Sequence, residues 1–487
     1  LQSRAQLQGS SRRPALRINA IAQQPGGPLL AATDSGLAVL KGARWQPMPV
    51  PALPSSRVLA LFADSLGVLA GTDKGYLELD TAMRPLPVEQ RFAGHHPLAL
   101  PHPVVLTALR AANGDLWLGT PGGLVHLTRQ GGLPVLKAIT EANGLGHDLV
   151  RCLHQDRSGG IWAGTAFGGI SKFTSDAFLY FTERDGLRSR IVSAIHRTPD
   201  GLLWLGTQGG GVACWDGTRL RSYGREEGLP SLFVTCLGED ARGHLLVGTA
   251  MHGVHRLNGD RFQPALQSGH LDDDRIHAIR TGPDGRAWVG ASTGLHREGP
   301  DGRFVAYSGI AQPVTALLLH ADTLWAGTDS GLVALPLAGG PPSALRHPRL
   351  PRVRITALVR DTPGNLWVGT AGDGLYRVQG SRMGHYTDDD GLQNLAVEAL
   401  ALDAQENLWL GTRKGIHQVE LDALQEQVLG IKAYGPDDGF IGIESLRGAA
   451  LLDNDSALWF GTVRGAIRYD PRLVVDDPRE PLVHLTE

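Results

Sequence analysis

The chain has 487 residues, of which 46 are Lys or Arg and 49 are Asp or Glu, so its formal net charge is −3. This balance provides no basic surface of the kind that binds nucleic acid or an anionic membrane, and a hydrophobic content of 42% excludes a disordered chain. No apolar run reaches about 18 residues, so no segment is predicted to span a bilayer.

From its beginning the chain repeats one motif. The first copy, LLAATDSGLAVL from Leu29, is followed by GVLAGTDKGYLEL, DLWLGTPGGLVHL and eight further variants, such as NLWVGTAGDGLYRV. The Gly of each Gly-Thr pair, replaced by Ala32 in the first copy, recurs up to Gly461 in ten steps, which gives a period of about 43 residues. Such a period is typical of four-stranded propeller blades and also of two-helix HEAT or armadillo units.

The local pattern favours strands. Within residues 355–387, ITALVRD alternates as a strand, TPGN is a turn, LWVGT is a second strand, AGDG is a turn, LYRV is a third strand, and SRMGHYT supplies an outer fourth strand. A two-helix unit needs uninterrupted stretches with 3.6-residue periodicity, whereas Gly interrupts this chain about every ten residues. The sequence therefore predicts an all-β fold, a β-propeller of four-stranded antiparallel blades with eleven repeats.

Large and small residues hold fixed places in the motif. Trp stands two residues before the Gly in eight copies and Leu in three, so we expect these side chains to fill the space between adjacent twisted sheets. The Gly leaves room for a neighbouring chain segment, and the Gly of the next hairpin, such as Gly331, is expected at positive φ. Cys152 and Cys236 hold equivalent first-strand places, and with Cys214 they are expected to be packed thiols.

Taken together, the first strand, the D-x-x-G-like turn, LW-x-GT, the Gly hairpin and the aromatic-ended outer strand resemble the two-component regulator propeller repeat. The segments ERDGL, DDDGL and DDGF between copies strengthen the resemblance, which runs from about residue 15 to residue 475. In that family the repeats form two seven-bladed propellers in the periplasmic part of hybrid histidine kinases or diguanylate cyclases. The resemblance implies a periplasmic ligand-sensing module of a membrane-bound protein, not an enzyme itself, that relays to a downstream kinase or cyclase.

The repeat count suggests a division of the chain. Counting seven repeats back from the last one assigns residues 181–475 to a complete C-terminal seven-bladed propeller. The four earlier repeats, in residues 1–180, cannot close a ring and would leave unpaired edges. We therefore expect a partial N-terminal propeller that lacks about three blades, or blades shared in a way the sequence does not show. Residues 476–487 resemble the start of a truncated immunoglobulin-like sandwich, reached through a linker.

Two sets of loops are the places to expect a ligand. The hairpins after Gly-Thr and the segments between blades emerge on one face of a propeller, and binding sites favour such loops on a rigid scaffold. Their mixed polar groups suit a small polar ligand such as an oligosaccharide, and the basic ones favour an acidic or sulfated sugar; the alternative is that they are solvated loop tips. The predicted binding residues are Gln208, His252, Asp329, Asp373, Arg413, Lys414, Arg464 and Arg447.

No motif of the sequence predicts a catalytic residue. GASTG at residues 290–294 fits the G-x-S-x-G pattern, but it is a hairpin copy of the repeat and not the strand-to-helix turn that the nucleophile elbow requires. The rival class of function is a propeller-fold carbohydrate-active enzyme, a lyase or a glycosidase. For that class Asp329 and Asp373 are the carboxylate pair to test.

No metal or cofactor is predicted either. The DDD runs at 272–274 and 388–390 lack the residue order of a calcium loop. His95, His96 and His102, in a Pro-rich insertion, lack ligand spacing. The expected partners are a small polar ligand and no nucleic acid, with the membrane reached only through downstream segments and a homodimer compatible with this organisation.

Overall fold

The computed structural model describes most of the chain in two compact units. Unit 1 comprises Leu1–Thr174 with Val475–Glu487, and unit 2 comprises Ser175–Val474. The sandwich start expected at residues 476–487 lies outside the described residues. The described residues are 17–86, 100–130, 133–141, 145–157, 159–173, 177–217, 219–240, 242–265, 275–337, 343–344, 352–380, 382–422, 427–435, 440 and 444–473.

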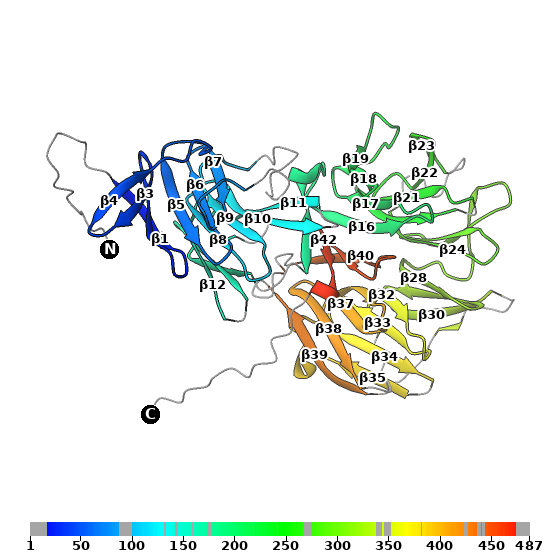
Figure 1. The fold of residues 1–487 in the computed structure, drawn as a ribbon. Helices are drawn as coiled ribbons and strands as arrows, with labels where there is room; N and C mark the ends of the chain where they lie inside the picture. The colour runs from blue at the N-terminus through cyan, green and yellow to red at the C-terminus, as the bar shows by residue number, and fades with distance from the viewer. Residues whose placement is uncertain are drawn as a thin grey trace, which may run out of the picture. The chain divides into compact units, whose positions relative to one another are not determined.

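Unit 1 consists of antiparallel sheets built from consecutive strands (Figure 1). Its described residues form four sheets, of which two have four strands and two have three. The sheets are β1 (Ile18–Gln23), β2 (Leu29–Thr33), β3 (Gly36–Lys41) and β4 (Arg44–Met48); β5 (Val58–Ala63), β6 (Val68–Thr72) and β7 (Gly75–Leu79); β8 (Thr107–Arg110), β9 (Leu116–Thr120), β10 (Gly123–Gln130) and β11 (Leu133–Ile139); and β12 (Val150–Gln155), β13 (Ile161–Thr165) and β14 (Ile170–Phe173).

Unit 2 has seven four-stranded antiparallel sheets within its described residues. Six of them use four consecutive strands, and their first, inner strands contact one another in chain order. The first three are β16 (Val192–Arg197), β17 (Leu203–Thr207), β18 (Gly211–Trp215) and β19 (Leu220–Tyr223); β20 (Val234–Glu239), β21 (Leu245–Thr249), β22 (Val254–Asn258) and β23 (Arg261–Pro264); and β24 (Ile276–Thr281), β25 (Ala287–Ala291), β26 (Gly294–Glu298) and β27 (Phe304–Ala306).

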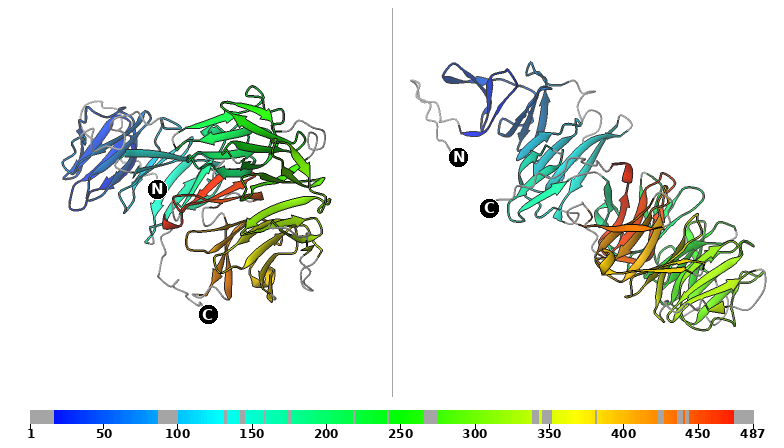
Figure 2. Two further views of the ribbon diagram at one scale, coloured as in Figure 1. Left: turned by 90° about the vertical axis from the view of Figure 1, so that its right-hand side faces the viewer. Right: turned by 90° about the horizontal axis from the view of Figure 1, so that it is seen from below.

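The remaining sheets of unit 2 continue around the same centre (Figure 2). They are β28 (Val314–His320), β29 (Thr323–Thr328), β30 (Gly331–Pro336) and β31 (Ser343–Ala344); β32 (Ile355–Arg360), β33 (Leu366–Thr370), β34 (Leu375–Gln379) and β35 (Arg382–Tyr386); β36 (Val397–Leu402), β37 (Leu408–Thr412), β38 (Gly415–Leu421) and β39 (Val428–Tyr434); and β40 (Ser445–Leu452), β41 (Leu458–Thr462) and β42 (Gly465–Tyr469) with β15 (Phe178–Phe181).

The last sheet joins the two ends of unit 2. β15 pairs antiparallel with β42, with Phe178 opposite Tyr469 and Phe181 opposite Ala466. The inner strands β16 and β40 are also in contact, and a Cβ on Gly461 would lie 2.4 Å from the carbonyl oxygen of Val192. Since the first strand of the unit hydrogen-bonds to the last, the ring of sheets is closed and leaves no free sheet edge at the junction.

The D-x-x-G turn and the Trp of the motif are joined by a hydrogen bond. The carboxylate of Asp361 accepts from Nε1 of Trp367 at 2.9 Å and from the backbone N–H of Asn365 at 2.6 Å. Asp403 accepts from Trp409 in the same way, at 2.9 Å. The turn therefore supplies the acceptor that a buried indole N–H requires.

The Thr and Gly of the motif close the next hairpin. Thr412 Oγ1 donates to the carbonyl of Gly415 at 3.0 Å and accepts from the backbone N–H of Lys414 at 3.1 Å. Gly415 has φ of 104°, and a Cβ there would lie 2.6 Å from the carbonyl oxygen of Tyr434. The predicted positive φ is confirmed for this hairpin and for Gly331, at 125°.

The Gly of Gly-Thr marks the contact between one sheet and the next. A Cβ on Gly206 would lie 2.5 Å from Cγ1 of Val234, the first residue of the next inner strand, and a Cβ on Gly369 would lie 2.9 Å from Cγ1 of Val397. Trp side chains fill the rest of the space, since Trp367 and Trp409 are almost fully buried. The predicted roles of this Gly and Trp are confirmed in unit 2.

The prediction of an all-β propeller fold of four-stranded antiparallel sheets is confirmed. The helices in the described part of the chain are single 3₁₀ turns: η3 (Glu183–Asp185), η4 (Asp388–Asp390) and η6 (Pro471–Leu473). None of them has the length and hydrophobicity needed to cross a bilayer. The core lies between adjacent sheets, as alternating strand residues require.

Candidate ligand-binding face of unit 2

The hairpins after Gly-Thr lie beside the segments between blades, as the sequence analysis expected. In several sheets, the residue that follows the Thr position donates its backbone N–H to the carbonyl of the residue just before the inner strand. This bond fixes both loops on one face of the unit. The pairs are Gln208 with Ile191 at 2.9 Å, Ala371 with Arg354 at 3.0 Å, and Val463 with Glu444 at 3.1 Å.

Four successive sheets place charged side chains together on this face. Arg354 donates to the carboxylate of Asp329 at 2.5 and 3.1 Å. Arg413 donates from Nε and Nη2 to Oε1 of Glu398 at 3.1 and 3.0 Å. Arg447 Nε lies 3.8 Å from the other oxygen of Glu398, and Arg413 Nε lies 3.9 Å from Oε1 of Glu444. We call these residues the charged cluster: Asp329, Arg354, Glu398, Arg413, Glu444 and Arg447.

The charged cluster is balanced, with three carboxylates and three guanidinium groups. Burial lowers the pKa of Arg447, and Arg354 and Arg413 act in the same direction, while the carboxylates of Glu398 and Asp329 oppose them. The hydrogen bond to Asp329 raises the pKa of Arg354. Because these groups influence one another, the cluster is one electrostatic unit.

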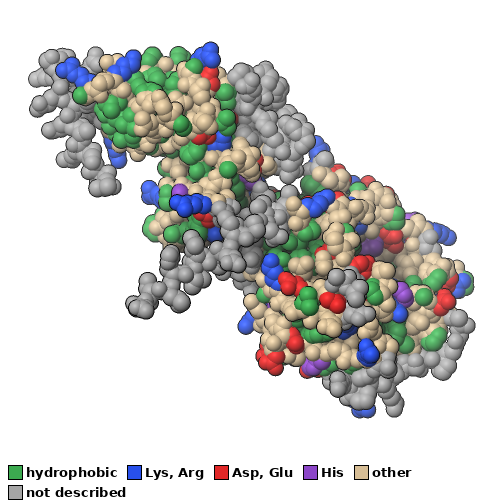
Figure 3. Space-filling view, turned by 60° about the horizontal axis from the view of Figure 1, so that its bottom comes forward, with side chains coloured by type: hydrophobic (Ala, Val, Ile, Leu, Met, Phe, Trp, Pro, Cys, Tyr) green, Lys and Arg blue, Asp and Glu red, His purple; other side chains and the backbone are tan. Residues whose placement is uncertain are grey.

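The cluster still has hydrogen-bonding capacity. The side chain of Glu398 is only 7% exposed, whereas that of Arg413 is 55% exposed. Within the described residues, Nε of Arg447 has no hydrogen-bond partner, but this atom is buried and does not face solvent. The exposed guanidinium of Arg413 can therefore donate to a polar ligand, and the cluster as a whole has no net charge. On the face that Figure 3 draws, both acidic and basic side chains are present among the described residues.

Three predicted binding residues lie in this cluster: Asp329, Arg413 and Arg447. Glu398 and Arg354 connect them but were not predicted from the sequence. Glu398 is the second residue of β36, a place held by Ser193 and other small or polar residues in the equivalent strands. A charged residue at the start of an otherwise apolar strand, VEALAL, is the signal that could have pointed to it.

The other five predicted residues are not part of the charged cluster. Asp373 accepts a hydrogen bond from the hydroxyl of Tyr376 at 2.6 Å; burial and this carboxylate raise the pKa of the Tyr376 hydroxyl. Within the described residues, no hydrogen bond or ion pair joins the rest to the charged cluster. The exposed ones are Gln208, His252, Lys414 and Arg464.

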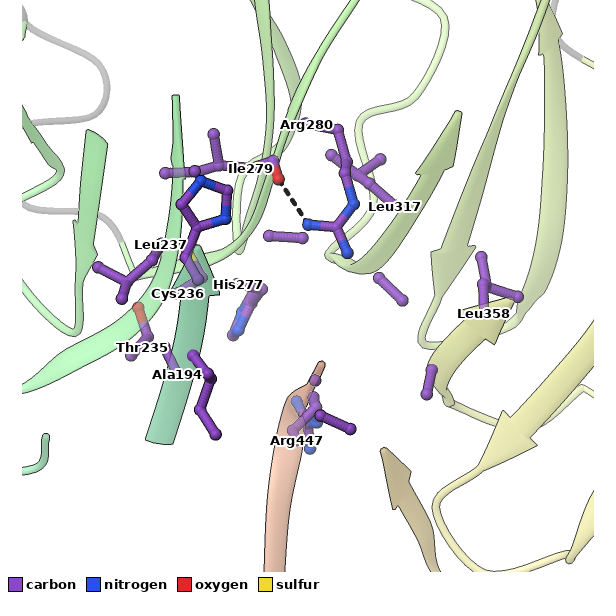
Figure 4. Close-up of a pocket in the computed structure, with 18 of the residues that line it drawn as sticks. Ala194, Thr235, Cys236, Leu237, His277, Ile279, Arg280, Leu317, Leu358 and Arg447 are labelled. Atoms are coloured by element: carbon purple, nitrogen blue, oxygen red, sulfur yellow. Dashed lines mark hydrogen bonds between the residues drawn. The ribbon is translucent and has the colours of Figure 1, made fainter. Parts of the chain in front are cut away.

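A channel runs through the centre of the ring. Its cavity has a volume of about 310 Å³ and is lined by residues of the inner strands, among them His196, Glu239, Arg280 and Arg447. Figure 4 shows Arg280 extending into the opening, with Leu317 and Leu358 on other strands and Arg447 on a separate strand. Arg447 belongs to both the channel lining and the charged cluster, so the cluster lies at the rim of the channel.

The GASTG string contains a Ser beside a His. Ser292 Oγ lies 3.0 Å from Nε2 of His277. The string is the hairpin between β25 and β26, and not a strand-to-helix turn. The geometry therefore lacks the backbone that exposes a nucleophile in this motif.

Among the described residues, no three His, Cys, Asp or Glu side chains lie together as a metal site would require. Asp388–Asp390 form η4 and are exposed. His95, His96 and residues 272–274 lie outside the described residues. The three cysteines are free thiols; Cys214 and Cys236 are buried as predicted, but the prediction of a packed thiol is wrong for Cys152, which is exposed.

The sequence matches a known repeat family at two places. The profile of the two component regulator propeller matches residues 144–167 and 349–372, each spanning a DGL-type or interblade segment, the D-x-x-G turn and LW-x-GT. Two segments of the chain match the two component regulator propeller repeat. This confirms the resemblance described from the sequence, and one matched segment lies in each unit. No protein with a curated description matches the chain.

Two solved structures of extracellular domains share the fold of this chain. The extracellular domain of a hybrid two-component system protein, BT3049 from B. thetaiotaomicron, is 19% identical with a TM-score of 0.57, over 96% of this chain and 70% of that one. The extracellular domain of BT4673 from the same organism is 16% identical with a TM-score of 0.52, over 95% of this chain and 66% of that one. Virginiamycin B lyase from Staphylococcus aureus is 17% identical with a TM-score of 0.48, over 60% of this chain and 97% of the lyase.

Proposed function

We propose that the chain is the extracytoplasmic, periplasmic ligand-sensing module of a membrane-bound signalling protein. It binds a small polar ligand, such as an oligosaccharide, and relays the bound state to a downstream histidine kinase or diguanylate cyclase. The regulator-propeller repeats support this role, as does the fold shared with extracellular domains of two-component systems. The two described relatives are longer than this chain, which spans 70% and 66% of them, and the relay belongs to the whole protein.

The charged cluster at the channel rim is the observation that carries the binding role. Its carboxylates accept hydrogen bonds from sugar hydroxyls, and its guanidinium groups donate to hydroxyl or acidic oxygens. Glu398 holds two arginines in place from a nearly buried position, which preorganises the donors and lowers the entropy cost of binding. Arg464 and Lys414, exposed on hairpins of the same kind, extend the polar surface available to a longer ligand.

The test is calorimetric titration of the purified chain with neutral and acidic oligosaccharides. Saturable binding is expected, and Glu398→Gln should weaken it about tenfold or more because Arg413 and Arg447 lose their shared carboxylate. Charge reversal of Arg413 and Arg464 together should weaken it also. Asp301→Asn is the matched control, since Asp301 forms an exposed pair with Arg303 outside the cluster.

The same samples distinguish a sensor from an enzyme. Saturable binding without product supports the sensing role, whereas turnover of the oligosaccharide would show a carbohydrate-active enzyme. The carboxylates suggested for catalysis are each already engaged, Asp329 by Arg354 and Asp373 by Tyr376. Unchanged affinity in the Glu398 variant would contradict the charged cluster as the binding site.

A further inference from the structure

An inner strand of unit 2 carries an arginine, Arg280, at a position where the other sheets of the unit have different residues. Arg280 of β24 stands opposite the motif residue Trp288. Because the other six sheets of unit 2 form without an arginine there, sheet formation does not explain this residue. The equivalent residues are His196, Gly238, Leu318, Val359, Ala401 and Leu451.

The Arg280 guanidinium has almost no protein partner. Nη1 donates to the carbonyl oxygen of Ile279 at 2.8 Å, as Figure 4 shows. Within the described residues, no carboxylate lies within ion-pair distance of Arg280, whereas one lies within that distance of Arg197 and one of Arg447. Arg197 lies 2.5 Å from Asp453. Of the five N–H donors of the Arg280 guanidinium, the hydrogen bond to the backbone uses one.

The surroundings of Arg280 favour an anion. Arg280 lines the cavity of about 310 Å³ and its side chain is exposed to the solvent there, while the protein atoms around it lower the pKa of its guanidinium. Glu239 is the one acidic side chain of the described lining, and its carboxylate is bonded to Nε2 of His196 at 3.0 Å. The other cation of the lining, Arg447, is already beside Glu398. The positive charge of Arg280 therefore has no bonded counter-ion.

We propose that Arg280 forms a binding site for an oxyanion group, a carboxylate, sulfate or phosphate, of a small ligand inside the channel of unit 2. A guanidinium group binds such groups through two parallel hydrogen bonds. The cavity lies at the lower end of the range of small-molecule pockets, about 300–1,000 Å³, so it admits a ligand of monosaccharide size. This site is centred on Arg280, which is not part of the charged cluster, although Arg447 of that cluster lines the same cavity; the proposal does not rest on the sensing role.

The test is titration of the purified chain with sodium sulfate, phosphate and glucuronate at constant ionic strength, with neutral glucose as the uncharged comparison. At least one oxyanion is expected to bind with a Kd in the millimolar range, and Arg280→Gln should weaken it about tenfold or more. Arg280→Lys should retain part of the affinity. Arg303→Gln, which removes an equal charge from an exposed pair with Asp301, should leave it unchanged.

A second variant, Arg280→Leu, and a second measurement, the pKa of His196, test the same proposal independently. Arg280→Leu places the residue of Leu318 and Leu451 at the same register, so the ring is expected to fold and to lose oxyanion binding. Burial lowers the pKa of His196, the carboxylate of Glu239 opposes this, and the charge of Arg280 lowers it further. Removing the arginine should therefore raise the pKa of His196, measured by NMR, and sulfate or glucuronate bound to the wild-type chain should raise it too.

Three results would overturn the proposal: no oxyanion saturating the wild-type chain up to about 50 mM, wild-type oxyanion affinity retained in Arg280→Gln and Arg280→Leu, or binding of glucose as strong as that of glucuronate. The Glu398→Gln variant separates this site from the charged cluster. Loss of oligosaccharide binding in that variant with oxyanion binding retained would support two sites, and the reverse pattern in Arg280→Leu would do the same.

Discussion

The last sheet of unit 1 and the second sheet of unit 2 carry the same motif residues, a Cys opposite the Gly of Gly-Thr, but these residues have different surroundings. Cys152 on β12 stands opposite Gly164, and Cys236 on β20 stands opposite Gly248. Yet Cys152 is exposed and Cys236 is buried. The register is the same, so the difference arises outside the sheet.

The neighbouring sheet makes the difference. In unit 2 the face that carries Cys236 packs on Ile276 and Ile279 of the next inner strand. On the corresponding face of β12–β14, Trp162 is 37% exposed and Ile170 is 72% exposed, and within the described residues no core cluster of unit 1 includes them. The motif thus encodes an interface between sheets, and its hydrophobic residues are buried only where another sheet supplies the second half.

The largest test of this comparison replaces the motif Trp. Trp409 and Trp162 both donate from Nε1 to the Asp of the preceding turn, at 2.9 and 2.7 Å. The two residues therefore share this hydrogen bond and differ in how their rings pack. Trp409→Ala should destabilise unit 2 by about 3–5 kcal/mol, because it leaves a cavity between sheets. Trp162→Ala should cost unit 1 less than about 1 kcal/mol. Differential scanning calorimetry of both variants checks this, and equal losses would contradict it.

The second test uses the thiols. Burial raises the pKa of Cys236 to about 12 and that of Cys214 to about 11, and both thiols lie away from solvent. An alkylating reagent attacks the thiolate, so Cys152 should react more than about 100-fold faster than either. Mass spectrometry of labelled peptides gives the three rates. In urea the three should become similar; similar rates in the native chain would mean that the faces do not differ in burial.

Much of the fold followed from the sequence because each repeat encodes its own strands and turns. The alternation of ITALVRD and the Gly-Thr hairpin are local, and so were predictable. The pairing of β15 with β42 was not, since Phe178 and Tyr469 are far apart along the chain and FLYF carries no signal for its partner. Likewise, Arg413 and Arg447 were singled out as loop cations, but the burial of Glu398 between them depends on the ring.

A pH test extends the comparison to a buried imidazole in unit 2. Burial lowers the pKa of His417 to about 4, and the backbone N–H of Gln393 donates to its Nε2 at 3.2 Å, which requires the neutral ring. The unfolded chain takes up a proton below a pH of about 6.5, so this stabilising contribution is complete above that pH and is lost as the pH falls toward 4.

The wild-type chain should therefore lose about 2 kcal/mol through this residue between pH 7 and pH 5. His417→Gln should remove that part of the loss, measured by urea unfolding at both pH values. His154→Gln, on the exposed face of β12, is the matched control and should leave the pH dependence as it is. A wild-type pH dependence in the His417 variant would show that this imidazole is not held neutral by the fold.

The smallest effect is expected from the Gly of Gly-Thr, and it isolates the neighbouring sheet most sharply. A Cβ on Gly248 would lie 2.4 Å from Sγ of Cys236 and 2.7 Å from Cγ2 of Ile276, whereas a Cβ on Gly164 would meet only Sγ of Cys152, at 2.4 Å. The exposed Cys152 can rotate away, but Cys236 and Ile276 are held in a packed core. Gly248→Ala should therefore cost about 1–3 kcal/mol and Gly164→Ala less than about 1 kcal/mol, by calorimetry of each unit. If the two substitutions cost the same, the Gly serves the conformation of its own sheet, and the approach of the next inner strand is not what requires it.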